Sequence, residues 1–186
     1  VQRLHQEDMC QATGRLPKRK YQRDGGPGLR DLAAAIRRFS ARPAHDLQQL
    51  LTATIANVCL GNGDAHAKNF AFLYTRDGRE LAPFYDVVST EVYPMLSPHL
   101  SMRVGHQYDP NALGREDVVR LAGDFSVAPT LVRSTVDHVT TTLRTVRDDV
   151  FHQVDQLTGG SADVLHRMQV LLESRLPAIE ELAQRS

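Results

Sequence analysis

One short stretch, residues 61–70, brings several chemically active side chains together in the sequence GNGDAHAKNF. It contains a carboxylate, an imidazole, an ammonium and two amides, which belong to Asp64, His66, Lys68, Asn62 and Asn69. A second carboxylate, Asp86, follows Asn69 by seventeen positions, after another apolar run. Phosphoryl transfer from a magnesium nucleotide requires such a set, because oxygen ligands hold Mg²⁺ and a carboxylate orients the attacking hydroxyl.

The spacing assigns a role to each of these side chains. In the catalytic loop of protein kinases, an Asp that acts as base precedes an Asn by five residues, and a hairpin then leads to a metal-binding Asp. Asp64 and Asn69 have this five-residue spacing, and Asp86 lies beyond a predicted hairpin. We therefore expect Asp64 to accept the proton of the attacking hydroxyl and Asn69 and Asp86 to bind Mg²⁺. Lys68 could reach a γ-phosphate oxygen, and His66 would hold the loop through hydrogen bonds.

Local patterns place these residues at the ends of short elements. Residues 70–74 and 80–84 are typical of strands, and Asp77-Gly78 between them predicts a hairpin, since this pair adopts positive φ readily. Apolar spacing predicts a helix from Leu29 and another that begins near Pro43 and ends at Gly61. We also expect a first helix over about residues 6–13 and a short strand over residues 99–104.

Everything after Asn111 is expected to be helical, with two apolar stripes. The first consists of Val132, Val136, Val139, Leu143, Val146, Val150 and Val154, and the second of Leu165, Met168, Leu172, Leu176 and Ile179. Such stripes could form an interface with a partner, but most amphipathic helices face their own core, and we expect packing within this domain. The predicted fold class is mainly α, with one small β-hairpin at which the polar residues gather.

Four parts of the sequence resemble the HipA-type serine/threonine kinases, the toxin components of bacterial toxin–antitoxin modules. The stretch GNGDAHAKNF at residues 61–70 closely resembles the signature of that family, and LAPFYDVVS at residues 81–89 resembles its metal-binding segment. Residues 3–12 resemble the helix after the nucleotide hinge, and Lys20-Tyr21 with the glycine-rich residues 25–28 is also similar to that region. The resemblance covers most of the chain up to about Arg103.

This resemblance implies the helical carboxy-terminal lobe of a protein-kinase-like fold over residues 1–186, with the nucleotide lobe absent. The family's phosphate-binding loop, ATP-anchoring lysine and adenine hinge have no counterpart in the sequence, and the chain begins with Val1 rather than Met. A complete enzyme of this kind would use ATP and Mg²⁺ to phosphorylate a serine or threonine of a protein substrate in the cytoplasm. Its expected partners are a DNA-binding antitoxin or the missing lobe supplied in trans.

Composition excludes other classes of function. Lys plus Arg and Asp plus Glu both number 22, so the formal net charge is zero, and we expect no direct binding to nucleic acid or membrane. Cys10 and Cys59 lack metal-site or redox spacing, and both are expected to be buried and reduced. No apolar run approaches the length of a membrane span.

Three alternatives stay open at this point. Residues 61–69 could simply cap a helix and turn into a strand, because Asn, Asp and Gly favour turns. Gly63-Asp64-Ala65-His66 resembles the first block of metallophosphoesterases, but the further blocks of that site do not occur. The serious rival is an inactive, truncated or split kinase lobe that acts as a protein-binding module.

Overall fold

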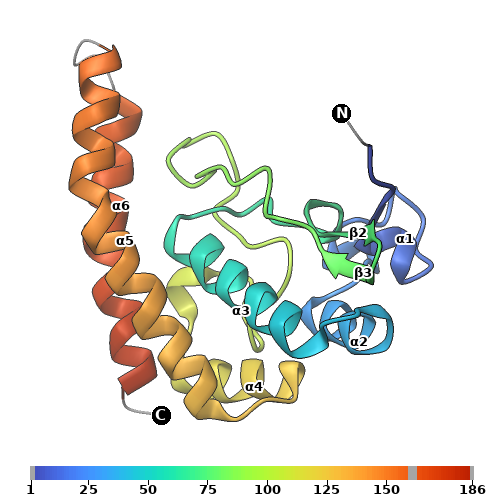
Figure 1. The fold of residues 1–186 in the computed structure, drawn as a ribbon. Coiled ribbons are helices and arrows are strands. Elements are labelled where there is room, and N and C mark those ends of the chain that lie inside the picture. Colours follow the sequence, from blue (N-terminus) through green and yellow to red (C-terminus); the bar gives the residue numbers. More distant parts are fainter. Residues whose placement is uncertain (1–2, 159–162, 185–186) are drawn as a thin grey trace.

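Helices dominate the structure, a computed structural model that describes residues 3–158 and 163–184 (Figure 1). The α-helices are α1 (Met9–Ala12), α2 (Leu29–Phe39), α3 (Pro43–Cys59), α4 (Arg115–Phe125), α5 (Pro129–Thr158) and α6 (Asp163–Gln184). Three 3₁₀ turns are η1 (Gln22–Asp24), η2 (Ala67–Asn69) and η3 (Pro110–Ala112). The mainly α fold class predicted from the sequence is confirmed.

One small antiparallel sheet, ordered β1-β2-β3, lies at the end of the molecule away from α5 and α6 (Figure 1). Its strands are β1 (Gln6–Asp8), β2 (Ala71–Thr75) and β3 (Gly78–Leu81). The predicted hairpin is therefore present, with the second strand starting two residues earlier than expected and ending before Pro83. Proline has no N–H to donate to a ladder, which accounts for the early end of β3.

The predicted first helix was wrong over its first turn. Gln6–Asp8 is a strand, with Gln6 opposite Leu73 of β2, and only Met9–Ala12 is helical. Asp8 is the N-cap of that helix: its side chain accepts from the backbone N–H of Gln11, while the Gln11 side chain accepts from the backbone N–H of Asp8. Pairing with β2 therefore ends where the capping box begins.

The strand expected over residues 99–104 was also wrong. This segment has an isolated bridge between Val104 and Gln107 and a hydrogen bond from the Leu100 N–H to the Tyr108 carbonyl, which is too little pairing for a strand. Leu100, Met102 and Val104 are nevertheless buried, so the alternating apolar pattern reports burial on one side rather than sheet formation.

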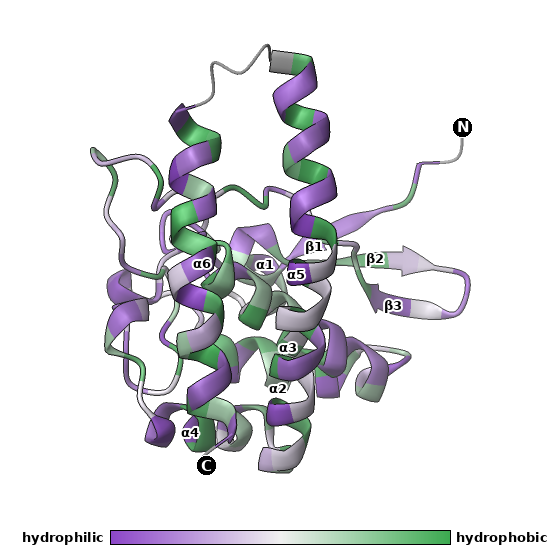
Figure 2. Ribbon diagram, turned by 90° about the vertical axis from the view of Figure 1, so that its left-hand side faces the viewer, coloured by the Kyte–Doolittle hydropathy of each residue, from purple (hydrophilic) through white to green (hydrophobic). Residues whose placement is uncertain are grey.

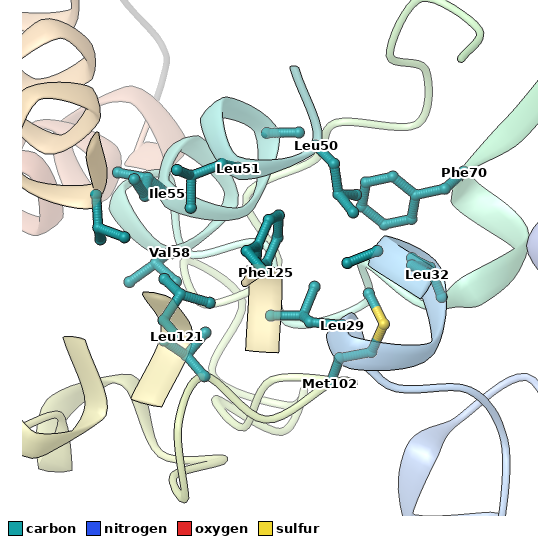
Figure 3. Close-up of a cluster of buried hydrophobic side chains, with 14 of the residues drawn as sticks. Leu29, Leu32, Leu50, Leu51, Ile55, Val58, Phe70, Met102, Leu121 and Phe125 are labelled. Atoms are coloured by element: carbon teal, nitrogen blue, oxygen red, sulfur yellow. The ribbon is translucent and has the colours of Figure 1, made fainter. Parts of the chain in front are cut away.

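The core lies between α2, α3, α4 and the long segments that cross them (Figure 3). Pro43 occupies the first turn of α3, as predicted, and the helix buries Leu50, Leu51 and Ile55. Phe125 of α4 is fully buried in the same cluster. Because α3 is held on several sides, its carboxyl end is a rigid support for the polar loop that follows.

The last two helices form an antiparallel pair that extends beyond the body of the molecule (Figures 1 and 2). Near the body, both stripes pack inside the domain, as predicted: the buried members are Val132, Val136, Val139, Leu172, Leu176 and Ile179. Further out, Val146 and Val150 are 43% and 47% exposed, so the prediction fails there. Helix α5 is simply longer than the core that it covers. Among the described residues, no helix is both long and apolar enough to span a membrane.

Candidate active site

The polar stretch 61–70 forms the connection between α3 and β2. Gly61 turns the chain with a φ of 66°, and its carbonyl accepts from the N–H groups of Thr90 and Glu91, both at 3.0 Å. The Gly63 N–H donates to the Thr90 hydroxyl at 2.8 Å. A Cβ at Gly63 would lie 2.9 Å from the His99 carbonyl oxygen, so only glycine fits there. The loop is thus fixed against the segment that follows Asp86.

The carboxamide of Asn69 contacts the carboxylate of Asp86. Asn69 Nδ2 donates to Asp86 Oδ2 at 2.5 Å, and Asn69 Oδ1 accepts from the His66 backbone N–H at 3.0 Å. Asn69 is buried, which limits its amide to this orientation. The structure therefore brings together the two residues that the sequence marks as metal ligands.

A third side chain, Asn62, links the two acid-bearing segments. Its Oδ1 accepts from the Asp64 N–H at 3.2 Å, and its Nδ2 donates to the Asp86 carbonyl at 3.4 Å and to Asn57 Oδ1 at 2.9 Å. Asp86 itself adopts a left-handed conformation with φ of 59°, which is uncommon for a residue other than glycine and is concentrated at functional sites. The buried Asn62 side chain therefore connects the backbone of Asp64 to the backbone of Asp86.

Asp64 is exposed, and its carboxylate does not share the contact between Asn69 and Asp86. Its Oδ1 accepts a hydrogen bond of 2.9 Å from the hydroxyl of Tyr21. An exposed, ionisable carboxylate with a free second oxygen meets the geometric requirement for accepting a proton from an approaching hydroxyl.

His66, in the same loop as Asp64, is buried. Only 6% of the residue is exposed, and the Tyr21 ring packs edge-on against the His66 ring at 5.3 Å between centroids. Burial lowers the pKa of His66 below 6.5, the charge of Lys20 lowers it further, and the carboxylates of Asp64 and Asp86 act in the opposite direction. Among the described residues, the buried Nδ1 of the His66 ring has no hydrogen-bond partner, so the contact by which His66 holds the loop is its backbone N–H, which donates to Asn69 Oδ1.

Lys68 is placed differently from the other members of the set. Its charge lowers the pKa of the Cys10 thiol, against the larger raising effects of burial and Asp8. Within the described residues, its ammonium forms no ion pair, while its carbonyl accepts from the Tyr85 hydroxyl at 2.6 Å. The cation that acts on His66 is Lys20 instead.

Comparison with known proteins gives this arrangement a family. Residues 1–147, most of the chain, match the model of the HipA-like C-terminal domain. The chain belongs to that family. The resemblance seen in the sequence is confirmed.

Two curated relatives of the HipA-like domain are named as kinases. "Putative kinase Y4mE" of Sinorhizobium fredii is 39% identical over 166 residues, which cover 89% of this chain and 40% of that protein. "Serine/threonine-protein kinase toxin HipA" of Shewanella oneidensis is 35% identical over 123 residues, which cover 61% of this chain and 28% of that protein. The chain therefore spans less than half the length of these relatives.

A solved structure extends the likeness to the fold. It is described as the Shewanella oneidensis toxin–antitoxin system HipA, HipB and its operator DNA complex. The match has a TM-score of 0.84 and 24% sequence identity and covers 99% of this chain and 46% of that chain. At this identity the match bears on the fold alone, and it confirms the architecture over nearly the whole chain.

The proposed base and the proposed metal ligands line two different cavities of the HipA-like domain. Asp64 lines a cavity of about 500 Å³ with Tyr21, Arg23, Thr90, Ser97 and His99. Asn69 and Asp86 line a smaller one, of about 40 Å³, with Asn62, Phe84 and Tyr85. The loop therefore contributes its proposed base to one cavity and its proposed metal-ligand pair to another, and Asn62 links the two segments.

The donor set at Asp86 fits a magnesium ion that takes its remaining ligands from phosphate and water. Mg²⁺ is usually bound in this way, through one or two protein oxygens. Asn69 Oδ1 keeps a second lone pair beyond its bond to the His66 N–H, and one Asp86 oxygen lies outside the contact with Asn69. No cluster of three or more His, Cys, Asp or Glu side chains suited to a metal occurs among the described residues, so the protein alone does not supply a full cage.

Two residues of the site were missed in the sequence. Asn62 was treated as part of a turn, although its two amide atoms join the segments that carry the acids. Tyr21 lies 43 positions before Asp64, and no local spacing connects them. For Asn62 the available signal was an amide between two glycines, and for Tyr21 it was the family resemblance of Lys20-Tyr21.

Proposed function

We propose that the chain is the catalytic lobe of a HipA-type serine/threonine protein kinase, which transfers the γ-phosphate of ATP to a serine or threonine of a protein substrate. The contact between Asn69 and Asp86, with Asn62 joining it to Asp64, carries this proposal. A loop that only caps a helix would not require a buried amide that connects two acid-bearing segments. Family membership and relatives named as kinases support the same reaction class.

The residues of the chain divide the work in this proposal. Asp64 orients the acceptor hydroxyl and takes its proton, while Asp86 and Asn69 offer oxygens to Mg²⁺. The His66 N–H fixes the Asn69 oxygen, and Lys68, with no ion pair among the described residues, is available to offset phosphate charge. When bound, ATP and Mg²⁺ supply the transferable phosphoryl group and the divalent charge that stabilises its transfer.

The nucleotide is held in large part by protein outside residues 1–186 in this proposal. The segment around Asp86 is rich in exposed apolar side chains, a composition suited to covering by further protein. These residues are Phe84, Tyr85, Val87, Val88, Tyr93, Met95 and Leu96. A nucleotide lobe, joined to the chain or supplied in trans, would cover this surface, and a DNA-binding antitoxin is a further partner of the assembled cytoplasmic toxin.

The same exposed surface favours a second candidate, an inactive lobe that serves as a protein-binding module. Activity separates the two. The chain is combined with a nucleotide lobe, and transfer of labelled γ-phosphate from ATP to protein serine and threonine is measured with and without Mg²⁺.

Asp64→Asn is the decisive variant in this assay. A general base contributes roughly 10²- to 10⁴-fold, so we expect the rate to fall at least about a hundredfold while the fold is retained. Asp77→Asn, at the exposed hairpin turn, is the matched control and should keep full activity. Unchanged transfer in Asp64→Asn would refute the base, and no transfer in any combination would favour the binding module.

A further inference from the structure

The orientation of Asp64 depends on one side chain from a distant part of the sequence. Among the described residues, the Asp64 carboxylate has a single hydrogen-bond partner, the Tyr21 hydroxyl at 2.9 Å. Because Asp64 is exposed, its carboxylate would otherwise occupy several rotamers. One donor on Oδ1 selects a single rotamer and leaves Oδ2 for an incoming group.

Tyr21 is itself held on more than one side. Its ring packs edge-on against the His66 ring, and the Lys20 ammonium lies 4.8 Å from its ring centroid. The Lys20 carbonyl accepts from the Ala67 N–H at 3.3 Å, so the backbone before Tyr21 is fixed to the same loop that carries Asp64. These contacts hold the Tyr21 side chain against the loop that carries Asp64.

The glycine-rich residues 25–28, which no step of the proposed reaction uses, contact the backbone of Tyr21. The Tyr21 carbonyl accepts from the Asp24 N–H at 3.1 Å and from the Gly26 N–H at 2.9 Å. A Cβ at Gly26 would lie 2.7 Å from the Tyr21 carbonyl oxygen and 2.3 Å from the Arg19 carbonyl oxygen. Any larger residue at position 26 must displace the backbone of Tyr21, because both neighbours are backbone atoms.

We propose that Tyr21 is a positioning residue for Asp64 and that the turn at Gly26 keeps it in place; this inference rests on the proposed kinase function. Tyr21 and Asp64 line the same cavity of about 500 Å³, the side from which an acceptor hydroxyl would approach. Tyr21 fixes the base toward that cavity. The rate of phosphoryl transfer is sensitive to this alignment, whereas the stability of the fold depends on it much less.

Tyr21→Phe tests the hydrogen bond in the kinase assembled with its nucleotide lobe. Because a hydrogen bond to a charged group is stronger than one between neutral groups, we expect this variant to lower kcat by about tenfold or more. The KM for ATP should stay unchanged, because Tyr21 acts on the proposed base. Tyr74→Phe is the matched control, because the Tyr74 hydroxyl donates to Glu7 Oε2 at 2.7 Å in the sheet, away from the loop. A wild-type kcat in Tyr21→Phe overturns the inference, as does an equal loss in both variants, which would indicate a general effect of removing a phenol.

Gly26→Ala tests the support. We expect it to lower kcat as Tyr21→Phe does, and the double variant to be no slower than Gly26→Ala alone, because both act through one hydrogen bond. Gly123→Ala in α4, where a Cβ meets nothing within 4 Å, is the control. If the losses in kcat of the two single variants multiply in the double variant, the turn at Gly26 acts independently of Tyr21, which would overturn that part of the inference. An inactive wild-type assembly would refute the proposed function itself, which distinguishes that failure from an active enzyme indifferent to Tyr21.

Discussion

Asn69 donates a hydrogen bond of 2.5 Å to Asp86 across the base of the β2–β3 hairpin. The contact satisfies the carboxylate with a neutral donor, so the site does not bring two negative charges together in the absence of a cation. It also makes the pair sensitive to a change of one atom, since an Asp at position 69 would replace the donor nitrogen with a second acidic oxygen.

Asn69→Asp should therefore make the stability of the chain depend on magnesium. Without metal, the buried donor is lost and two carboxylates face each other, which is expected to lower the free energy of unfolding by about 1–3 kcal/mol. Saturating Mg²⁺ should restore most of the loss, because a ligand that binds only the folded state stabilises it. Urea unfolding with and without Mg²⁺ measures this, with Gln153→Glu as a charge-matched control on an exposed residue of α5. A loss that Mg²⁺ leaves unchanged would contradict a shared cation site.

The second prediction concerns the ion pair between buried Arg175 of α6 and partly buried Glu91, which lies in the segment after Asp86. Arg175 donates to Glu91 at 2.7 Å and to the Val58 carbonyl at 3.0 Å, and its side chain is 5% exposed. Arg175→Met leaves the partly buried Glu91 without this partner and should lower the unfolding free energy by up to about 3–5 kcal/mol, the cost of breaking a buried pair.

The control for this prediction is Arg144→Met, at an ion pair of similar length on the surface. Arg144 lies 2.8 Å from Glu180 with 44% of its side chain exposed, and exposed pairs contribute roughly 0–1 kcal/mol. Adding Glu91→Gln to Arg175→Met should recover part of the loss, since the unpaired charge is then removed. Equal costs for the two arginine variants would show that burial of the Arg175 pair has no special weight.

The third prediction concerns the two cysteines, which are both buried and free, as expected from the sequence. Burial raises the pKa of Cys59 from 9.0 to about 12, and burial also raises that of Cys10. A raised pKa keeps the thiol protonated at pH 8, and the thiolate is the reactive form, so both should resist iodoacetamide in the folded chain. Mass spectrometry after alkylation at pH 8, with a sample in urea as reference, checks this. Rapid native labelling of Cys59 would contradict the burial described for α3.

The sequence predicted those parts of the fold that local signals specify. Pro43 marked the start of α3, Gly61 its end, and Asp77-Gly78 the hairpin, because each of these residues restricts or permits backbone angles regardless of the remainder of the chain. The five-residue spacing of Asp64 and Asn69 and the position of Asp86 marked the site in the same local way.

Contacts between distant segments were beyond such signals. Gln6–Asp8 became a strand because β2, more than sixty residues later, offers it an edge. The hydrogen bond from Tyr21 to Asp64 and the double contact of Asn62 arise only when α3 and the segments on either side of it have packed. The exposure of Val146 and Val150 likewise depends on where the core ends, which periodicity does not report.

Because Asn62 joins the Asp64 and Asp86 segments directly, the hairpin lying between them in the chain is not what sets their separation. Its tip at residues 76–77 is exposed and distant from that amide, so lengthening the turn changes the path of the chain and not the position of either acid. The tip is thus a suitable place to insert a reporter peptide. Homologous chains can differ in length there without a change in the positions of the two acids.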